Sequence, residues 1–157
     1  MSDFSQLPVR LAEAIADFEF VDRALRAELL IEYADRFVEV PASVATRPFA
    51  QSDRAPRCES EAFVFAVDQP DGTLHFYFAV ENPQGLSAKA WGVLLEETCS
   101  GEPLEQVAAV PQDIVFSVFG KDLSMGKGQG LIGMLELMQH RCRERIVQRR
   151  MRAAGLS

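Results

Sequence analysis

The stretch EAFVFAVDQPDGTLHFYFAVE, which runs from Glu61 to Glu81, decides the fold of this protein. Two runs rich in aromatic and β-branched residues flank the residues QPDG, and both runs have a strong preference for β-strands. Alternation gives each run two faces: Phe63, Phe65 and Val67 oppose Ala62, Val64 and Ala66, and Leu74, Phe76, Phe78 and Val80 oppose His75 and Tyr77. The residues between the runs are typical of a turn. The stretch therefore predicts an antiparallel β-hairpin.

Helical patterns lie on both sides of this hairpin, with Pro, Asp and Gly as start and stop signals. The expected helices cover Pro8 to about Asp17, Asp22 until Pro41, Leu86 to Cys99, the segments EPLEQVAAV and PQDIVFSVF, and a long helix from near Gly128 or Gly130 toward Arg150. This order predicts an α+β fold in which helices cover one face of a small antiparallel sheet. Residues 1–157 are expected to form a single domain.

Composition and charge exclude several classes of protein. The chain has 157 residues, of which 48% are apolar and 25% are charged, as in ordinary soluble domains. No run of about 18 apolar residues predicts a membrane span, and MSDFSQLPVR is not typical of a secretory signal. The net charge of −7 disfavours nucleic acid, because phosphates repel an acidic surface. The arginines of Arg141–Arg152 indicate a solvated helix face, or alternatively a docking surface for an acidic partner.

Most chemical motifs are absent from the sequence. His75 and His140 have no partners at metal-ligand spacing, so we expect no metal site. The segment GKDLSMGKGQG lacks the spacing of a phosphate-binding loop, and no nucleophile elbow is present. Glu96 and Glu97 are adjacent on a helix and point in different directions, which disfavours an acid–base pair.

The three cysteines differ in their surroundings. They are odd in number and far apart, which disfavours a disulfide framework and indicates a reducing, cytosolic compartment. Cys142 continues an apolar helical stripe, and Cys99 ends a helix on its apolar side, so both are expected in the core. Cys58 lies where the long loop from Val40 meets the hairpin, beside Arg57 and Glu59. These neighbours leave two interpretations open, a bystander thiol or a reactive one.

Two motifs resemble a known family. The segment RCESEAFVF resembles the glycine-cysteine-x-serine-x-aromatic segment of the SufE family of sulfur-acceptor proteins. The later block VPQDIVFSVFGKDLSMGKGQGLIGMLELM resembles the second motif of that family, and the AKAWGVLLEE helix fits between them. The likeness covers roughly Val9 to Val147, and the segment 148–157 is expected to be a frayed basic tail.

The resemblance implies both a fold and a function. The fold would be the two-layer SufE/IscU-like arrangement of a small sheet against helices. Such proteins bind a pyridoxal-phosphate-dependent cysteine desulfurase of the SufS type and take persulfide sulfur onto a cysteine that matches Cys58. They pass the sulfur to a SufBCD-like assembly complex for iron–sulfur clusters. The resemblance thus implies a cytoplasmic co-catalyst and not a stand-alone enzyme, monomeric or weakly dimeric, with no cofactor of its own and no membrane partner.

Two residues depart from the family pattern. Arg57 stands where the family has glycine before the cysteine, and Lys127 stands where the later motif has arginine. Both are candidates for supporting or docking roles. A resting state that shelters Cys58 against the sheet and extends it on docking is a further hypothesis, because an exposed reactive thiol oxidises readily.

Two alternatives stay open beside the sulfur acceptor. One is an IscU-type scaffold whose three cysteines bind an iron–sulfur cluster or zinc. The other is an interaction module whose cysteine has lost its role.

Overall fold

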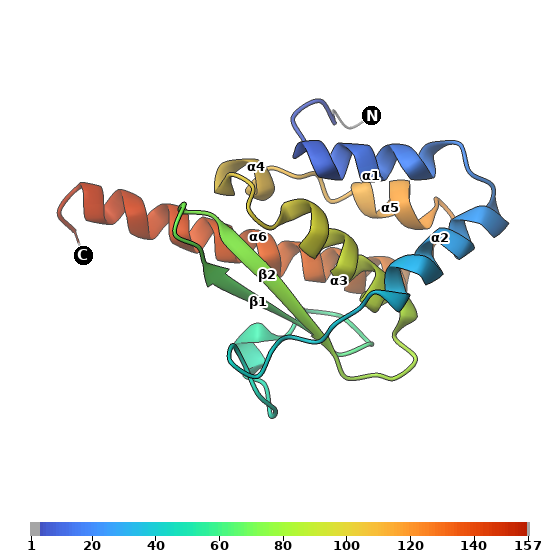
Figure 1. The fold of residues 1–157 in the computed structure, drawn as a ribbon, viewed down its shortest axis with the longest axis horizontal. Helices are drawn as coiled ribbons and strands as arrows, with labels where there is room; N and C mark the ends of the chain where they lie inside the picture. Colours follow the sequence, from blue (N-terminus) through green and yellow to red (C-terminus); the bar gives the residue numbers. More distant parts are fainter. Residues whose placement is uncertain (1–3, 157) are drawn as a thin grey trace.

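A computed structural model describes residues 4–156 of the chain, and Figure 1 shows its fold. Within these residues there are six α-helices and one two-stranded sheet. In chain order the elements are α1 (Val9–Glu19), α2 (Arg23–Asp35), a 3-10 helix η1 (Gln51–Asp53), β1 (Ala62–Asp68), β2 (Leu74–Val80), α3 (Leu86–Cys99), α4 (Leu104–Ala108), α5 (Ile114–Phe119) and α6 (Met125–Ala153). The predicted α+β class and the order of its elements are confirmed.

The predicted hairpin is present, and its register sets which side chains face the helices. β1 and β2 pair antiparallel, with Ala62 opposite Val80 and Asp68 opposite Leu74. The turn closes through a hydrogen bond from the Gln69 amide to the Thr73 carbonyl, 2.9 Å long. One face of this hairpin, which includes Val64, Phe76 and Phe78, belongs to the main core. The second face carries Phe63, Phe65 and Ala79.

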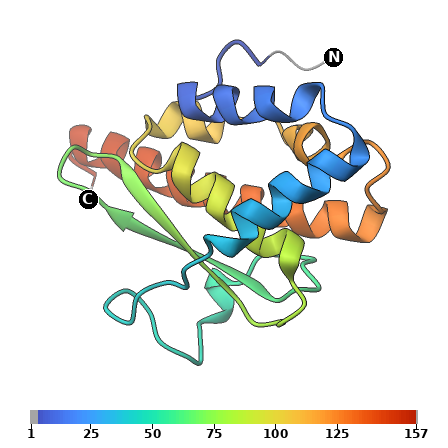
Figure 2. The ribbon, with the colours of Figure 1, turned by 45° about the vertical axis from the view of Figure 1, so that its right-hand side comes forward.

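The helices form a layer on the first face of the hairpin, as Figures 1 and 2 show from two directions. α3 packs on β2 and α6 packs on β1, while α1 and α2 cover α3. Trp91 of α3 is fully buried and its indole N–H donates to the Leu131 carbonyl of α6, at 2.9 Å. This bond satisfies the polar atom of a large core side chain and joins the two helices that hold the sheet.

Helices cover one face of the hairpin, as predicted, and a loop that the sequence did not predict as a cover lies on the second face. The long loop between α2 and β1 crosses this face, and Phe49 packs there with ring centroids 5.1 Å from Phe63 and 5.2 Å from Phe65. Val40 reaches the edge of the hairpin, and its amide donates to the Phe78 carbonyl at 2.9 Å. The reason is hydrophobic: two phenylalanines that point away from the helices need another apolar cover.

Two helix boundaries differ from those predicted. α2 begins as expected after Asp22, whose carboxylate accepts from the Leu25 amide, but it ends at Asp35, well before Pro41. The chain leaves the helix early because its next residues run to the edge of β2.

α6 begins at Met125, with Ser124 as its N-cap, and therefore starts before Gly128 or Gly130, where its beginning was expected. It also continues to Ala153, so residues 148–153, expected to be a frayed tail, are its last turns. α6 has 29 residues, yet no helix between residues 4 and 156 combines the length and apolar character needed to cross a membrane.

Candidate functional site

Cys58 lies at the tip of a short closed loop, residues 55–62, which we call the cysteine loop. The Ala55 amide donates to the Ala62 carbonyl at 2.9 Å and closes the neck of this loop. Within it, the Glu61 amide donates to the Cys58 carbonyl at 3.1 Å. β1 starts only at Ala62, so the strand does not extend to Cys58. The prediction that Cys58 stands where the long loop enters the hairpin is confirmed.

Two residues of the cysteine loop adopt a left-handed backbone conformation. Arg57 has φ of +58° and Glu61 has φ of +52°, and neither is glycine. Side chains with a Cβ are strained in this region, whereas glycine is not. The position of Arg57 is the one where the SufE pattern has glycine, so the backbone geometry gives a physical reason for that preference. In this chain the arginine carries the strain.

The cysteine loop rests against two glycines inside α6. A Cβ placed on Gly130 would come within 3.1 Å of the Cys58 Cα, and one placed on Gly133 would clash with the Pro56 carbonyl oxygen. Glycine at these two positions therefore permits a close approach of two backbones. Sequence reasoning missed both residues. Glycines within a helical pattern were the available signal, since a helix that keeps them usually needs the space.

The Cys58 thiol is sheltered beside a cavity. Cys58 is 7% exposed, and the adjoining cavity has a volume of about 370 Å3. The lining comes from the cysteine loop, the starts of α3 and α6, and the segment before α3; it includes Ser60, Leu86, Lys127 and Leu131. Cys58 is thus sheltered beside Gly130 of α6, and the Ser60 and Glu61 carbonyls of its loop accept from the Asn82 and Glu81 amides that follow β2.

The charges near this cavity are mixed: the Glu59 carboxylate lines it, and positive groups face it from two helices. The N-termini of α3 and α6 both border it, and free amide groups at a helix N-terminus attract negative charge. Lys127, in the first turn of α6, lines the same cavity. The structure therefore brings together Cys58 and Lys127, two of the three residues singled out from the sequence.

Arg57, the third, points the other way along α6. Its guanidinium donates to a Glu136 carboxylate oxygen at 2.9 Å, and the Gln112 side-chain amide donates to the other oxygen at 3.0 Å. Glu136 and Gln112 were not expected from the sequence. No local pattern links them to Arg57, because Glu136 lies 79 positions farther along the chain.

The other two cysteines are buried core residues, as predicted. Cys99 and Cys142 are each 0% exposed. Burial raises the pKa of the Cys99 thiol to about 12, and burial also raises the pKa of the Cys142 thiol to about 12. At neutral pH both side chains are therefore inert as nucleophiles, since the thiolate is the reactive form.

The histidines and carboxylates do not form a metal site in the part of the chain that the structure describes. His75 lies 3.2 Å from a Glu96 oxygen, and burial raises the pKa of this glutamate while His75 opposes the shift. His140 lies 3.8 Å from Glu144 on the surface of α6. Between residues 4 and 156, no group of three or more His, Cys, Asp or Glu side chains is arranged to hold a metal ion.

The fold and the site together define a small α+β protein that carries one cysteine on a closed loop, packed against a helix. The SufE family model, described as an Fe-S metabolism associated domain, matches residues 12–142. The chain therefore belongs to the SufE family and has a role in iron–sulfur metabolism.

Individual relatives agree with this assignment. Two proteins of Mycobacterium tuberculosis, from two different strains, are each described as an uncharacterized SufE-like protein. Each is 27% identical over 143 residues, which is 89% of this chain and 96% of the relative. The solution structure of a hypothetical protein from Thermus thermophilus matches with a TM-score of 0.70 and 28% identity, over 90% of this chain and 98% of that one.

Proposed function

We propose that this protein is a sulfur acceptor and carrier that stimulates a pyridoxal-phosphate-dependent cysteine desulfurase of the SufS type. Cys58 receives the sulfur, and a SufBCD-like complex that assembles iron–sulfur clusters takes it onward. The main support for this proposal is that Cys58, alone among the three cysteines, lies on a loop beside a surface cavity. In this role the protein is a cytoplasmic co-catalyst and not an enzyme by itself.

The proposed step is a thiol–persulfide exchange. The Cys58 thiolate attacks the terminal sulfur of the donor's cysteine persulfide, a new S–S bond forms, and the donor's S–S bond breaks. The donor sulfur leaves as a thiolate and takes up a proton, so the exchange needs no external oxidant or reductant. The product is a persulfide on Cys58; the helix N-termini and Lys127 at the cavity attract its anionic form, and the Glu59 carboxylate at the same cavity opposes it.

Transfer also requires the cysteine loop to move. A thiol that is 7% exposed cannot enter another protein's active site from its resting position. We therefore expect residues 55–61 to extend when the donor docks. Hydrogen exchange of this segment, measured with and without a desulfurase, tests the movement, and equal protection in both samples would contradict it.

The transfer itself is tested by peptide mass spectrometry. The protein is mixed with a SufS-type desulfurase and cysteine without reductant, and each cysteine is examined for a mass increase of one sulfur. We expect the addition on Cys58 and its loss in Cys58→Ser, while a Cys99→Ser, Cys142→Ser double variant still accepts sulfur. Turnover of the desulfurase with no sulfur on Cys58 would refute the proposal.

The same samples address the two alternatives. An IscU-type scaffold requires Cys99 and Cys142, so bound iron or zinc that depends on them would favour that function. An interaction module without cysteine chemistry requires that Cys58→Ser still stimulates the desulfurase fully.

A further inference from the structure

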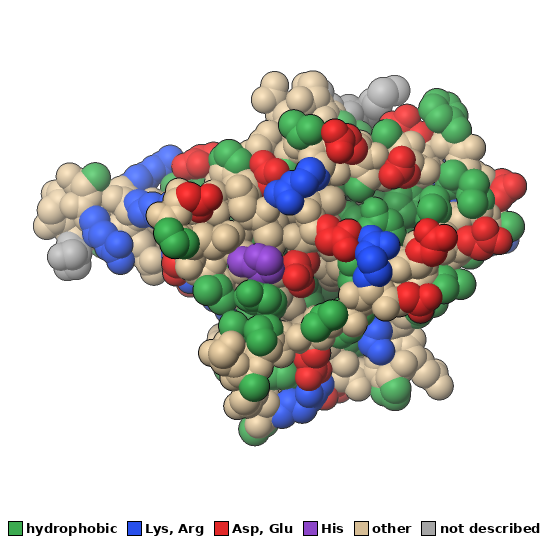
Figure 3. Space-filling view, in the orientation of Figure 1, with side chains coloured by type: hydrophobic (Ala, Val, Ile, Leu, Met, Phe, Trp, Pro, Cys, Tyr) green, Lys and Arg blue, Asp and Glu red, His purple; other side chains and the backbone are tan. Residues whose placement is uncertain are grey.

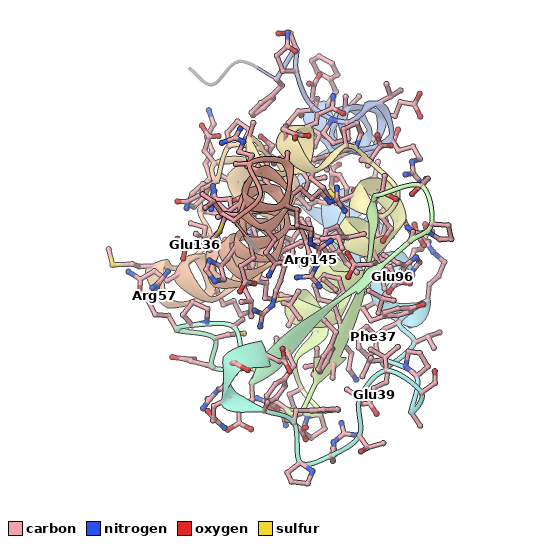
Figure 4. The ribbon with its side chains drawn as sticks, turned by 90° about the vertical axis from the view of Figure 1, so that its left-hand side faces the viewer. Phe37, Glu39, Arg57, Glu96, Glu136 and Arg145 are labelled. Atoms are coloured by element: carbon pink, nitrogen blue, oxygen red, sulfur yellow. The ribbon has the colours of Figure 1, made fainter. Side chains whose placement is uncertain are left out.

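One ion pair ties the tip of the cysteine loop to α6. Arg57 immediately precedes Cys58, and its guanidinium meets Glu136 at 2.9 Å. In Figure 4 the two labelled side chains lie next to each other, one from the loop and one from α6. Gln112, from the turn before α5, binds the second oxygen of Glu136 and so fixes its direction. The loop is thereby held through a side chain adjacent to the thiol.

The rest of the cysteine loop is poised between opposing forces. The close contacts of Pro56 and Cys58 with Gly133 and Gly130 favour the closed position. The left-handed conformations of Arg57 and Glu61 oppose it, because both would be relieved if the loop opened. The Arg57–Glu136 ion pair adds to the contacts that favour the closed loop, and it is the one that a single change of charge removes.

We propose that Glu136 is a positioning residue for Cys58: through Arg57 it holds the cysteine loop closed on α6, and breaking this ion pair releases the thiol. The ion pair does in this chain what no glycine at position 57 could do. A glycine would remove the strain but would offer no side chain to α6. The inference rests on the proposed function for its purpose, since loop release matters when Cys58 must reach a donor.

The effect of the ion pair on the loop can be tested without a desulfurase, by comparing the accessibility of Cys58 with and without the pair. The rate of Cys58 alkylation by iodoacetamide is followed by mass spectrometry for the full-length protein over a series of pH values, and variants are compared at the plateau rate, where the thiol is fully ionised and only accessibility differs. Arg57 and Glu136 are 49% and 34% exposed at their side chains, so their pair is of modest strength. We expect Glu136→Gln to raise the rate about two- to five-fold.

A charge exchange separates positioning from general loosening. Arg57→Glu alone should raise the alkylation rate, whereas Arg57→Glu combined with Glu136→Arg should return it to within about two-fold of the wild type. The matched control is Asp68→Asn, which breaks the 3.1 Å pair of Asp68 with Arg145 farther along α6 and should leave the rate unchanged. Cys99 and Cys142 report on folding, since they stay unmodified in an intact protein.

Salt provides a readout without any risk of misfolding. Added salt screens a half-exposed ion pair, so the wild-type rate should rise with ionic strength while that of Glu136→Gln should not. A Glu136→Gln rate equal to that of the wild type, or a charge exchange that fails to restore it, would overturn the proposal. Neither result depends on whether Cys58 accepts sulfur, so this inference and the proposed function can fail separately.

Discussion

At the scale of single residues, Arg57 is the position that the structure explains best. From the sequence it is an arginine in place of the family's glycine, with no evident reason for either residue. Its φ of +58° accounts for the glycine, and its contact with Glu136 accounts for what the arginine adds. At this residue the backbone strain destabilises the closed loop and the side-chain contact stabilises it.

Two substitutions separate these effects. Arg57→Ala and Arg57→Gly both remove the ion pair, but only glycine removes the left-handed strain. We expect the glycine variant to be more stable than the alanine variant by about 0.5–1 kcal/mol in urea unfolding. At Gln148, in the regular part of α6, the order should reverse, with alanine more stable than glycine by about 1 kcal/mol. Equal stability of the two Arg57 variants would show that the backbone relaxes away from this conformation.

At the scale of elements, α6 is the helix on which the cysteine loop packs. It begins at Met125, where Ser124 caps it, and so includes glycines that helix propensity alone would place outside a helix. Glycine weakens a helix interior by about 1 kcal/mol relative to alanine. That cost is offset where the missing side chains let the cysteine loop approach, as Gly130 and Gly133 do.

Gly133→Ala tests this function of the helix. Its Cβ would clash with the Pro56 carbonyl oxygen, which is backbone and cannot rotate away, so the cysteine loop must shift. We expect a loss of about 1–3 kcal/mol in stability and faster alkylation of Cys58. Gly128→Ala is the control, because its nearest neighbour would lie at 3.6 Å, an ordinary contact, and it should stabilise α6 slightly. Slow alkylation in Gly133→Ala would mean that the loop tolerates the added methyl group.

At the scale of the whole molecule, the arginines of α6 connect distant parts of the chain. Figure 3 shows basic side chains over the end of α6 that projects from the body. The expectation of a merely solvated face was wrong for Arg141, whose side chain is 16% exposed and contacts Ser52, Asp53 and Glu144. It was also wrong for Arg145, which pairs with Asp68 at the end of β1. These contacts fasten the long loop and the hairpin to one helix.

This network predicts a loss of stability in acid. The hydrogen bond from Arg141 is the main cause that lowers the pKa of Glu144 below its ordinary value of 4.5. A carboxylate whose pKa is lowered by folding stabilises the folded state above the unfolded pKa, and this contribution disappears as the pH falls through the folded pKa. We expect Glu144→Gln to be less stable than the wild type by under about 1 kcal/mol at pH near 7 in urea unfolding. The difference should shrink progressively as the pH falls below 4.5, and a difference that does not shrink in acid would contradict an ionic origin.

Much of the fold could be predicted because it depends on local order. Alternation over residues 62–80 was enough for the hairpin, and helical spacing was enough for α1, α3 and the short helices. The end of α2 and the bounds of α6 could not be predicted. The residues after α2 run to the edge of β2, and the glycines inside α6 are explained only by the cysteine loop packed on them. The apolar loop that covers Phe63 and Phe65 was equally hidden, because Val40, Val44 and Phe49 follow no regular period.

The sequence by itself determined the class of fold, the order of its elements and the burial of Cys99 and Cys142, which leaves Cys58 as the cysteine outside an apolar helical stripe. Those conclusions need only neighbours along the chain, where side-chain periodicity separates buried from exposed positions. Tertiary structure alone decided how Cys58 is held: the left-handed backbone at Arg57, the glycines beneath the loop, and Glu136, which is 79 positions away from Arg57. Contacts between residues so far apart arise only when α6 folds back over the start of the hairpin, and no local pattern encodes them.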